Sequence, residues 1–347
     1  MKKGALSVMD KISQEPAAQH MTTTVATVSP LLDRVGQSLI AWVELYKALH
    51  VRGAPLKTQQ AKARDLIAFV QFFRVEVGHD HIDTWTPAVT KHFQQALLKT
   101  ISQQTGRPYA ATTVNRVIAT VRHFGRWVHQ QRPLVAGDPF EGVRDVQVDD
   151  PDWNGLTPRQ VLRLKAACEQ RIKACVRGDQ NPLLEAAVFY TLLQSGLRES
   201  ELIALEIRQY HHRGLHDVQR RKNKRVTTKV PLPQEARDFL DRYLATRPQA
   251  QAREPLFISR YSNRLQEQDV RRICLRLLNQ AQAFLSDDEK FRFTPHMLRH
   301  TFLKKVTDKH GVHFAQQMSG NISIKEIFRY AKPSQAEVDQ TVEELFQ

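Results

Sequence analysis

The sequence predicts a mainly α-helical (α+β) protein, with an N-terminal four-helix domain followed by a mixed domain of helices and a small antiparallel β-sheet. Four stretches in the first part of the chain place apolar residues at helical spacing, with no strand pattern between them. A segment rich in glycine, proline and aspartate follows, and beyond it one stretch of strand formers interrupts further helical patterns. A chain of 347 residues is long enough for two domains that each bury a core.

Apolar stripes define the four N-terminal helices, which are expected within residues 29–140, after a mobile tail of residues 1–28 without periodicity. The stripes are Leu39, Val43 and Tyr46 in the first helix; Leu66, Phe69, Val70 and Phe73 in the second, about 58–75; Val89, Phe93, Leu97 and Ile101 in the third, about 87–101; and Val114, Val117, Ile118, Val121, Phe124 and Val128 in the fourth, from Thr112.

Residues 141–155 have the composition of a linker, with turn formers and few large apolar side chains. Thr157-Pro158 then matches a helix start, a capping hydroxyl followed by proline at the first helical position. β-Branched residues over 214–232 predict a β-hairpin or a three-stranded sheet. Further helices are expected at 182–194, 234–246, 266–285, 295–310, 323–330 and 334–346.

The charge of the chain points to a polyanionic partner. A net charge of +15 and a pI near 9.9 make a surface that attracts polyanions, of which nucleic acid is the commonest. A basic protein without a nucleic-acid function is the alternative. The basic residues on the second and fourth helices either form a solvated face or follow phosphates; they are Lys57, Lys62, Arg64, Arg116, Arg122 and Arg126.

Cysteine usage indicates a reducing compartment. Cys168, Cys175 and Cys274 are odd in number and form no CxxC pair, which argues against a disulfide framework or a zinc knuckle. The first residues lack the apolar segment of a secretory signal, and no apolar run approaches the roughly 18 residues of a membrane span. We therefore expect a soluble cytoplasmic protein.

The string His296-Met-Leu-Arg299-His300 carries the most specific chemistry. Thr294-Pro295 marks a helix start, so His296 and Arg299 share one face of the first turn, beside unpaired backbone N–H groups. A guanidinium, an imidazole and a helix N-terminus together suit phosphate. Zinc bound by His296 and His300 is disfavoured because no third ligand is evident and Arg299 would repel the ion.

Three further features accompany this string. Arg198 follows a glycine turn after an apolar helix and needs a partner, either a binding anion or one of the neighbours Glu199 and Glu201. The basic run 220–225 sits at a hairpin turn, where lysine can reach a phosphate and donate a proton. Tyr330 ends a short helix, where a tyrosine is most often merely packed.

Taken in order, these pieces resemble the tyrosine recombinase, or phage integrase, family: an arginine after Ser-Gly-Leu, a basic hairpin, His-x-x-Arg opening a helix, a glycine turn and a tyrosine after it. The resemblance covers about residues 30–335. Its N-terminal part rests on the helix from Thr112 to Trp127 and the Asp138-Pro139-Phe140 turn, which look like the core-binding domain of that family.

The resemblance implies a role for each motif. Arg198 and Arg299 would hold the scissile phosphate, and His296 would assist proton transfer and stabilise the pentavalent transition state. Lys222 would be the general acid for the leaving 5′-hydroxyl. Tyr330 would attack phosphorus to form a 3′-phosphotyrosyl bond, which conserves the phosphodiester energy, so that no ATP, metal or other cofactor is required.

Two positions depart from the pattern or fit it loosely. Lys224 could replace Lys222 as the acid. Asn321 stands where the family usually has His or Trp after the glycine; it can orient by hydrogen bonding but cannot shuttle a proton at neutral pH. The expected DNA contacts are Lys57, Lys62, Arg64, Arg116, Arg122, Arg221, Lys224 and Arg225.

The family resemblance also implies how the protein works. Residues 29–140 would grip one face of duplex DNA and a catalytic domain, 156–333, the other, while a C-terminal helix in 334–347 would contact another protomer. Four protomers on two specific recombination sites would exchange strands through a Holliday junction, in integration, excision or transposition of mobile DNA in the nucleoid. Accessory DNA-bending proteins are further candidate partners. The alternatives are a type IB topoisomerase-like enzyme and a catalytically silent, sequence-specific DNA-binding regulator.

Overall fold

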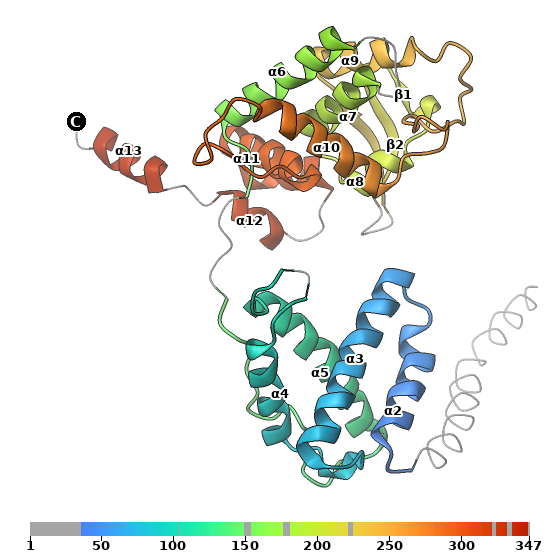
Figure 1. Ribbon diagram of the computed structural model, residues 1–347, viewed down its shortest axis with the longest axis vertical. Helices are drawn as coiled ribbons and strands as arrows, with labels where there is room; N and C mark the ends of the chain where they lie inside the picture. Colours follow the sequence, from blue (N-terminus) through green and yellow to red (C-terminus); the bar gives the residue numbers. More distant parts are fainter. Residues whose placement is uncertain are drawn as a thin grey trace, which may run out of the picture. The chain divides into compact units, whose positions relative to one another are not determined.

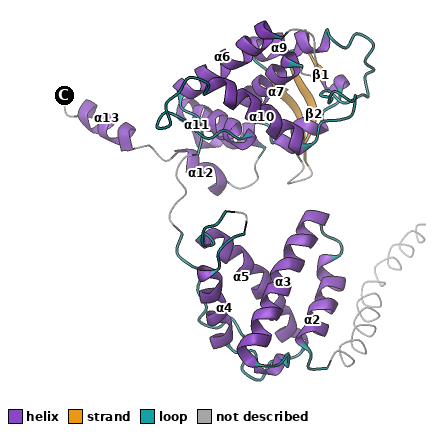
Figure 2. Cartoon of the chain, in the orientation of Figure 1, coloured by secondary structure: helices purple, strands orange, loops and turns teal. Residues whose placement is uncertain are grey.

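The computed structural model describes residues 36–103, 105–148, 154–175, 181–220, 225–320, 324–331 and 335–345. The chain divides into two compact units, Met1–Asp149 (unit 1) and Asp150–Gln347 (unit 2) (Figure 1). Each unit has a hydrophobic core of its own. The described residues are mostly helical, and their strands form one small antiparallel sheet in unit 2 (Figure 2), which confirms the expected mainly α composition.

Unit 1 is helical throughout its described part. Its elements are α2 (Leu39–Tyr46), continued by a π-helical turn (Lys47–Val51), α3 (Leu56–Val77), α4 (Pro87–Lys99) and α5 (Ala111–Gln131). The predicted apolar stripes contribute to the core of unit 1; for example, Leu66, Phe69 and Phe73 of α3 are fully buried. The Ile101 side chain, predicted to extend the third stripe, is instead 55% exposed, because α4 ends at Lys99 and no longer directs it inward.

Unit 2 is built around α7 (Pro182–Ser195), whose side chains are buried on nearly every side. It packs against α6 (Pro158–Ala174), α9 (Gln234–Leu244), α10 (Glu267–Ala281) and α11 (Pro295–Ser319). The remaining helices are α8 (Glu199–Ala204), α12 (Lys325–Ala331) and α13 (Gln335–Leu345). A helix that is apolar all round has to be enclosed by others, which explains its central place.

The predicted strands form a three-stranded sheet in the order β1-β2-β3. These are β1 (Tyr210–His211), β2 (Gly214–Arg220) and β3 (Arg225–Pro231), all antiparallel. The last pair of the β2–β3 register joins Arg220 to Arg225, so the basic run begins inside the sheet. Val218 and Arg220 are buried while Gln219 between them is exposed, the alternation that a half-buried strand requires.

The α10 helix of unit 2 is shorter than expected, and further helical segments were not expected. The α10 helix ends at Ala281 instead of extending to 285. The first part of α11 ends at 310, as expected, because Gly311 interrupts the helix with a φ of 82° and a ψ of 172°, which only glycine adopts readily; a second helical segment, which was not expected, follows up to Ser319. The interruption shifts the helical phase, so the segment after it carries no stripe continuous with the first part. The short α8 was not predicted for a similar reason: one and a half turns are too few to show a period.

The cysteines of unit 2 differ in their exposure to solvent. Cys168 and Cys274 are buried and Cys175 is exposed, and burial raises the pKa of the Cys168 and Cys274 thiols well above the usual value. No helix in the described ranges is both long enough and apolar enough to cross a membrane.

Candidate active site

The turn after α7 presents the first arginine. Gly196 ends the helix with φ at +64°, and a Cβ there would collide with the Phe302 ring of α11. The close approach of the two elements therefore needs glycine. Arg198 follows in an extended conformation as the N-cap residue of α8, with its side chain 19% exposed.

Glu201 is the partner that the sequence left undecided for Arg198. Its side chain is completely buried, and its Oε1 accepts a hydrogen bond from Arg198 Nη1 at 2.9 Å. Its Oε2 accepts bonds from the Arg198 backbone N–H at 3.0 Å and from Arg220 Nη1 at 2.9 Å. A buried carboxylate that accepts hydrogen bonds from two guanidinium groups fixes the position of both of them.

Arg299 is the second arginine, in the first turn of α11, and is only 2% exposed. Its Nη1 donates to the Gly196 carbonyl and its Nη2 to the Ser319 carbonyl, the latter at 3.0 Å. Burial and the nearby Arg198 and Arg220 lower the pKa of Arg299 to about 10, against the opposing effect of Glu201 and Tyr330. The guanidinium is still charged at neutral pH, in a place where its attraction for an anion is weakly screened.

Histidine rings connect this region to the tyrosine. His296 is exposed, and its ring meets that of His300 edge to face, with centroids 4.5 Å apart. The His300 ring lies 5.2 Å from that of Tyr330, which is itself 4% exposed and packs with Leu303 and Ile327. Tyr330 comes from α12, which packs against α11.

The structure thus brings together four of the six expected catalytic residues. Arg198 and Tyr330 both act electrostatically on Arg299, and the His300 ring lies between His296 and Tyr330. The other expected positions, Lys222 and Asn321 with the DNA contacts Arg221 and Lys224, lie outside the described residues, and for Arg225 only the backbone is described.

The sequence reasoning missed the roles of three site residues. Glu201 had been one of two alternatives, His300 only a disfavoured zinc ligand, and Arg220 one member of a basic run. Arg220 is in fact 1% exposed. The signal that could have identified it is its two-residue spacing from the apolar Val218, which places both on the inner face of β2.

The basic residues of unit 1 fall into two groups. Arg116 makes a two-pronged ion pair with the buried Asp65, at 2.5 and 3.0 Å, and Arg122 pairs with Asp145 at 2.7 Å. Both therefore have a structural role, although half of the Arg116 side chain stays exposed. Lys57 and Arg64 are exposed on α3, and Lys62 is half-buried.

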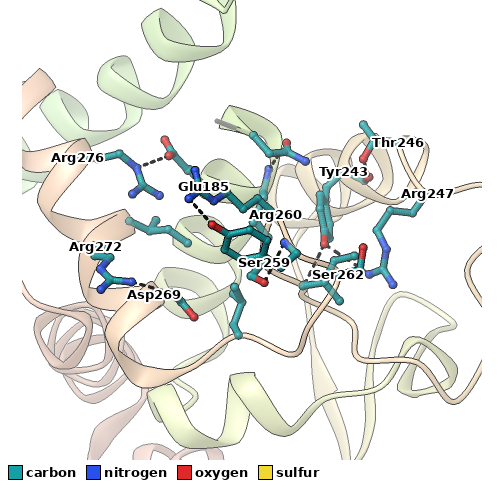
Figure 3. A pocket seen from close by; sticks show the side chains of 16 residues that line it. Glu185, Tyr243, Thr246, Arg247, Ser259, Arg260, Ser262, Asp269, Arg272 and Arg276 are labelled. Carbon is teal, nitrogen blue, oxygen red and sulfur yellow. Dashed lines mark hydrogen bonds and ion pairs between the residues drawn. The ribbon is translucent and has the colours of Figure 1, made fainter. Parts of the chain in front are cut away.

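Unit 2 also has a hollow between α7, α9, α10 and the loop before α10, and none of the expected catalytic residues lines it (Figure 3). Arginines line it, but acidic groups hold three of them: Arg276 bonds to the buried Glu185 at 2.5 Å, Arg272 to Asp269 at 3.2 Å and Arg247 to Glu254 at 2.9 Å. Arg171 also bonds to Glu185, at 2.6 Å, so the carboxylate links α6, α7 and α10. We interpret this cluster as structural.

No group of three metal-ligating side chains occurs among the described residues. Within that part of the chain, the site consists of cations, an imidazole pair and a phenol around one buried carboxylate. Such a set can bind a phosphate, stabilise extra negative charge on it and offer an oxygen nucleophile.

A model of the phage integrase family matches residues 154–337, more than half of the chain. The chain belongs to this family. The match contains every expected catalytic residue, and it confirms the family that the ordered motifs indicated.

Individual relatives agree with the family match. The tyrosine recombinase XerC of Thermodesulfovibrio yellowstonii is 29% identical over 260 residues, which cover 72% of this chain and 77% of that protein. A lambda integrase dimer bound to a COC′ core site superposes with a TM-score of 0.65 at 16% identity, over 85% of this chain and 95% of that one. A lambda integrase tetramer bound to a Holliday junction superposes with a TM-score of 0.63 at 15% identity, over 91% of this chain and 84% of that one. At these identities the two structures show that this member of the integrase family shares their fold.

Proposed function

We propose that this chain is a site-specific tyrosine recombinase, which cuts and rejoins DNA strands through a 3′-phosphotyrosyl intermediate. The observation that carries the proposal is the placement of Arg299, which is bonded to the Gly196 carbonyl two residues before Arg198, with both Arg198 and Tyr330 close enough to act on its charge. Membership of the phage integrase family supports the same chemistry.

In the proposed reaction, Arg198 and Arg299 bind the non-bridging oxygens of the scissile phosphate. The Tyr330 oxygen attacks phosphorus, the P–Oη bond forms and the P–O5′ bond breaks. The 5′-oxygen leaves with a proton from Lys222 or Lys224, and the proton of the phenol passes to a base, for which His296 is the candidate. Asn321 orients the phosphate. Attack by a 5′-hydroxyl on the phosphotyrosine reverses every step, so rejoining consumes no ATP.

The electrostatics of the site suit this reaction. The phosphate gains a second negative charge in the pentavalent transition state, while the two arginines are already fixed before DNA arrives. Cations that need no reorganisation stabilise the transition state more than the ground state. Since Arg299 is 2% exposed, water competes little for its charge.

Double-stranded DNA with specific recombination sites is the proposed substrate, and a homo-tetramer is the proposed assembly. The basic α3 surface of unit 1, with Lys57, Lys62 and Arg64, would contact the backbone of the duplex. A tetramer bound to a Holliday junction is the state in which a lambda integrase of the same fold was solved. Integration, excision and transposition all use this chemistry, and the mapped cleavage position on native DNA would distinguish them.

The C-terminal helix α13 is the proposed contact between protomers. Its apolar residues Val338, Val342 and Leu345 are 37%, 51% and 72% exposed, so they make a stripe that unit 2 leaves uncovered. We expect Val342→Asp to reduce tetramer formation on paired sites by about 10-fold or more, the effect of burying a charge in place of an apolar side chain. Analytical ultracentrifugation of protein with one-site and two-site DNA measures it.

The matched control for this variant is Glu343→Gln, a change at the neighbouring, exposed position. It should assemble normally, and both variants should bind a single site like the parent protein. Full tetramer formation by Val342→Asp would contradict the proposed role of α13 and leave the chemistry untouched.

A nicked suicide substrate tests the function itself. The short fragment that carries the released 5′-hydroxyl, between the cleaved bond and the nick, diffuses away, so a covalent protein–DNA adduct accumulates and appears on a denaturing gel. We expect an adduct that forms in EDTA without ATP and is destroyed by protease. Relaxation of supercoiled DNA irrespective of sequence would favour a topoisomerase, and tight site-specific binding without any adduct would favour a regulator.

A further inference from the structure

Arg220 is a buried cation that the proposed mechanism does not use. Three other elements of unit 2 enclose it at the end of β2. Its Nη1 donates to Glu201 of α8 at 2.9 Å, its Nε to the Thr227 hydroxyl of β3 at 2.9 Å, and its Nη2 to the Met318 carbonyl of α11 at 3.4 Å. Gly320 covers it so closely that a Cβ there would lie 2.8 Å from Arg220 Nε.

These contacts close a ring through both phosphate-binding arginines. Arg198 is joined to Glu201, Glu201 to Arg220, and Arg220 to the carbonyl of Met318. The next carbonyl, that of Ser319, accepts from Arg299, whose other amino group returns to Gly196, two residues before Arg198. The position of each arginine therefore depends on the other members of the ring.

We propose that Arg220 is a positioning residue for the phosphate-binding pair: it holds Glu201 so that Arg198 remains available to DNA. This inference rests on the proposed recombinase function. Arg220 itself is 1% exposed and fully engaged by protein, so it does not touch the phosphate.

Arg220 contributes to the charge balance around Glu201. Glu201 is a buried carboxylate whose charge is shared between Arg198 and Arg220. Without Arg220, Glu201 would keep its ion pair with Arg198, which would be drawn more tightly to the carboxylate and away from an incoming phosphate. The cluster would also lose one positive charge near Arg299, where Arg220 acts through space.

The test is single-turnover cleavage by Arg220→Met with two suicide substrates. One carries a normal scissile phosphodiester, and the other a methylphosphonate, in which a methyl group replaces a charged oxygen. We expect DNA affinity within about 3-fold of the parent and cleavage of the phosphodiester slower by roughly 30-fold or more. The loss should shrink several-fold on the neutral methylphosphonate, which depends less on cations.

Two further variants identify the cause. Arg220→Lys restores the charge but cannot span three acceptors, so it should recover part of the rate. In Arg220→Met with Glu201→Gln, the unbalanced carboxylate is gone, and cleavage should be faster than in the single variant. No recovery in this double variant would overturn the charge-balance argument.

Arg247→Met is the matched structural control. Arg247 is 9% exposed and is bonded to Glu254 and to the carbonyls of Pro255 and Leu256, none of which belongs to the ring. Its loss should lower thermal stability. Any decrease in cleavage rate should be the same for the phosphodiester and for the methylphosphonate. If Arg220→Met slowed the cleavage of both substrates equally, or left the cleavage rate unchanged, the proposal would be wrong. A parent protein that forms no adduct would instead refute the recombinase function.

Discussion

Tyr330→Phe is expected to abolish the covalent adduct while leaving DNA binding intact. The substitution removes one oxygen, and the ring keeps its packing on Leu303 and Ile327 and its contact with His300. Because the proposed reaction uses this oxygen as its nucleophile, we expect a fall in cleavage of roughly a thousandfold or more. A denaturing gel after incubation with the suicide substrate, beside a binding titration at fixed salt, measures both quantities.

Tyr210→Phe is the matched control for the nucleophile. Its hydroxyl also makes a specific contact, a hydrogen bond to Asp241 at 2.7 Å, but the residue belongs to β1 rather than to the site. This variant should form the adduct at the parental rate. Mass spectrometry of the parental adduct should find the nucleotide on the peptide that contains Tyr330; an adduct of equal yield from Tyr330→Phe would reassign the nucleophile.

Local patterns were enough to predict most of the fold. Strong stripes such as Leu66, Phe69 and Phe73 define a helix and its buried face without knowledge of the rest of the chain. The helix ends beside the two arginines could also be located from local signals, since Gly196 terminates α7 and Pro295 opens α11 where the sequence indicated. The two arginines could be located because each stands next to one of these signals.

The network that connects the arginines could not be predicted from local patterns. Arg220 meets Met318 across 98 residues of sequence, and whether a member of a basic run points inward depends on the sheet register and on the turn that covers it. The choice of Glu201 over Glu199 likewise follows from which residue faces β2 once α8 has formed. Such contacts are tertiary, and a run of charges read alone suggests only solvent exposure.

Arg299→Lys should separate charge from geometry in the site. Lysine keeps a cation but offers a single ammonium, which cannot bond to the Gly196 and Ser319 carbonyls and also bind a phosphate. We expect cleavage to fall by about 100-fold or more at neutral pH, the scale of losing a preorganised transition-state donor. One buried carbonyl left without a donor should also lower unfolding free energy by roughly 1–3 kcal/mol.

The pH dependence of this variant distinguishes the physical cause of its loss. The pKa of Arg299 is lowered to about 10 by burial and by the neighbouring cations, so the parent keeps this charge up to that pH. The same surroundings act on a lysine whose ordinary pKa is about 10.4, well below that of arginine, and therefore bring its deprotonation toward neutrality. The ammonium is charged at low pH and lost as pH rises, so the ratio of parental to variant cleavage should grow between about pH 6 and 9.

A substitution at an exposed arginine provides the control for the ratio of parental to variant cleavage. Arg159→Lys alters a side chain that is 76% exposed and paired with Glu289 on the surface. Its cleavage should follow the parent at every pH, because an exposed lysine stays charged throughout the range. A flat ratio for Arg299→Lys would mean that the buried site keeps an ammonium protonated, so that lost geometry alone causes the defect. A rising ratio would show that arginine is needed there for its high pKa as well as for its shape, since the same burial that strengthens its hold on a phosphate would discharge a weaker base.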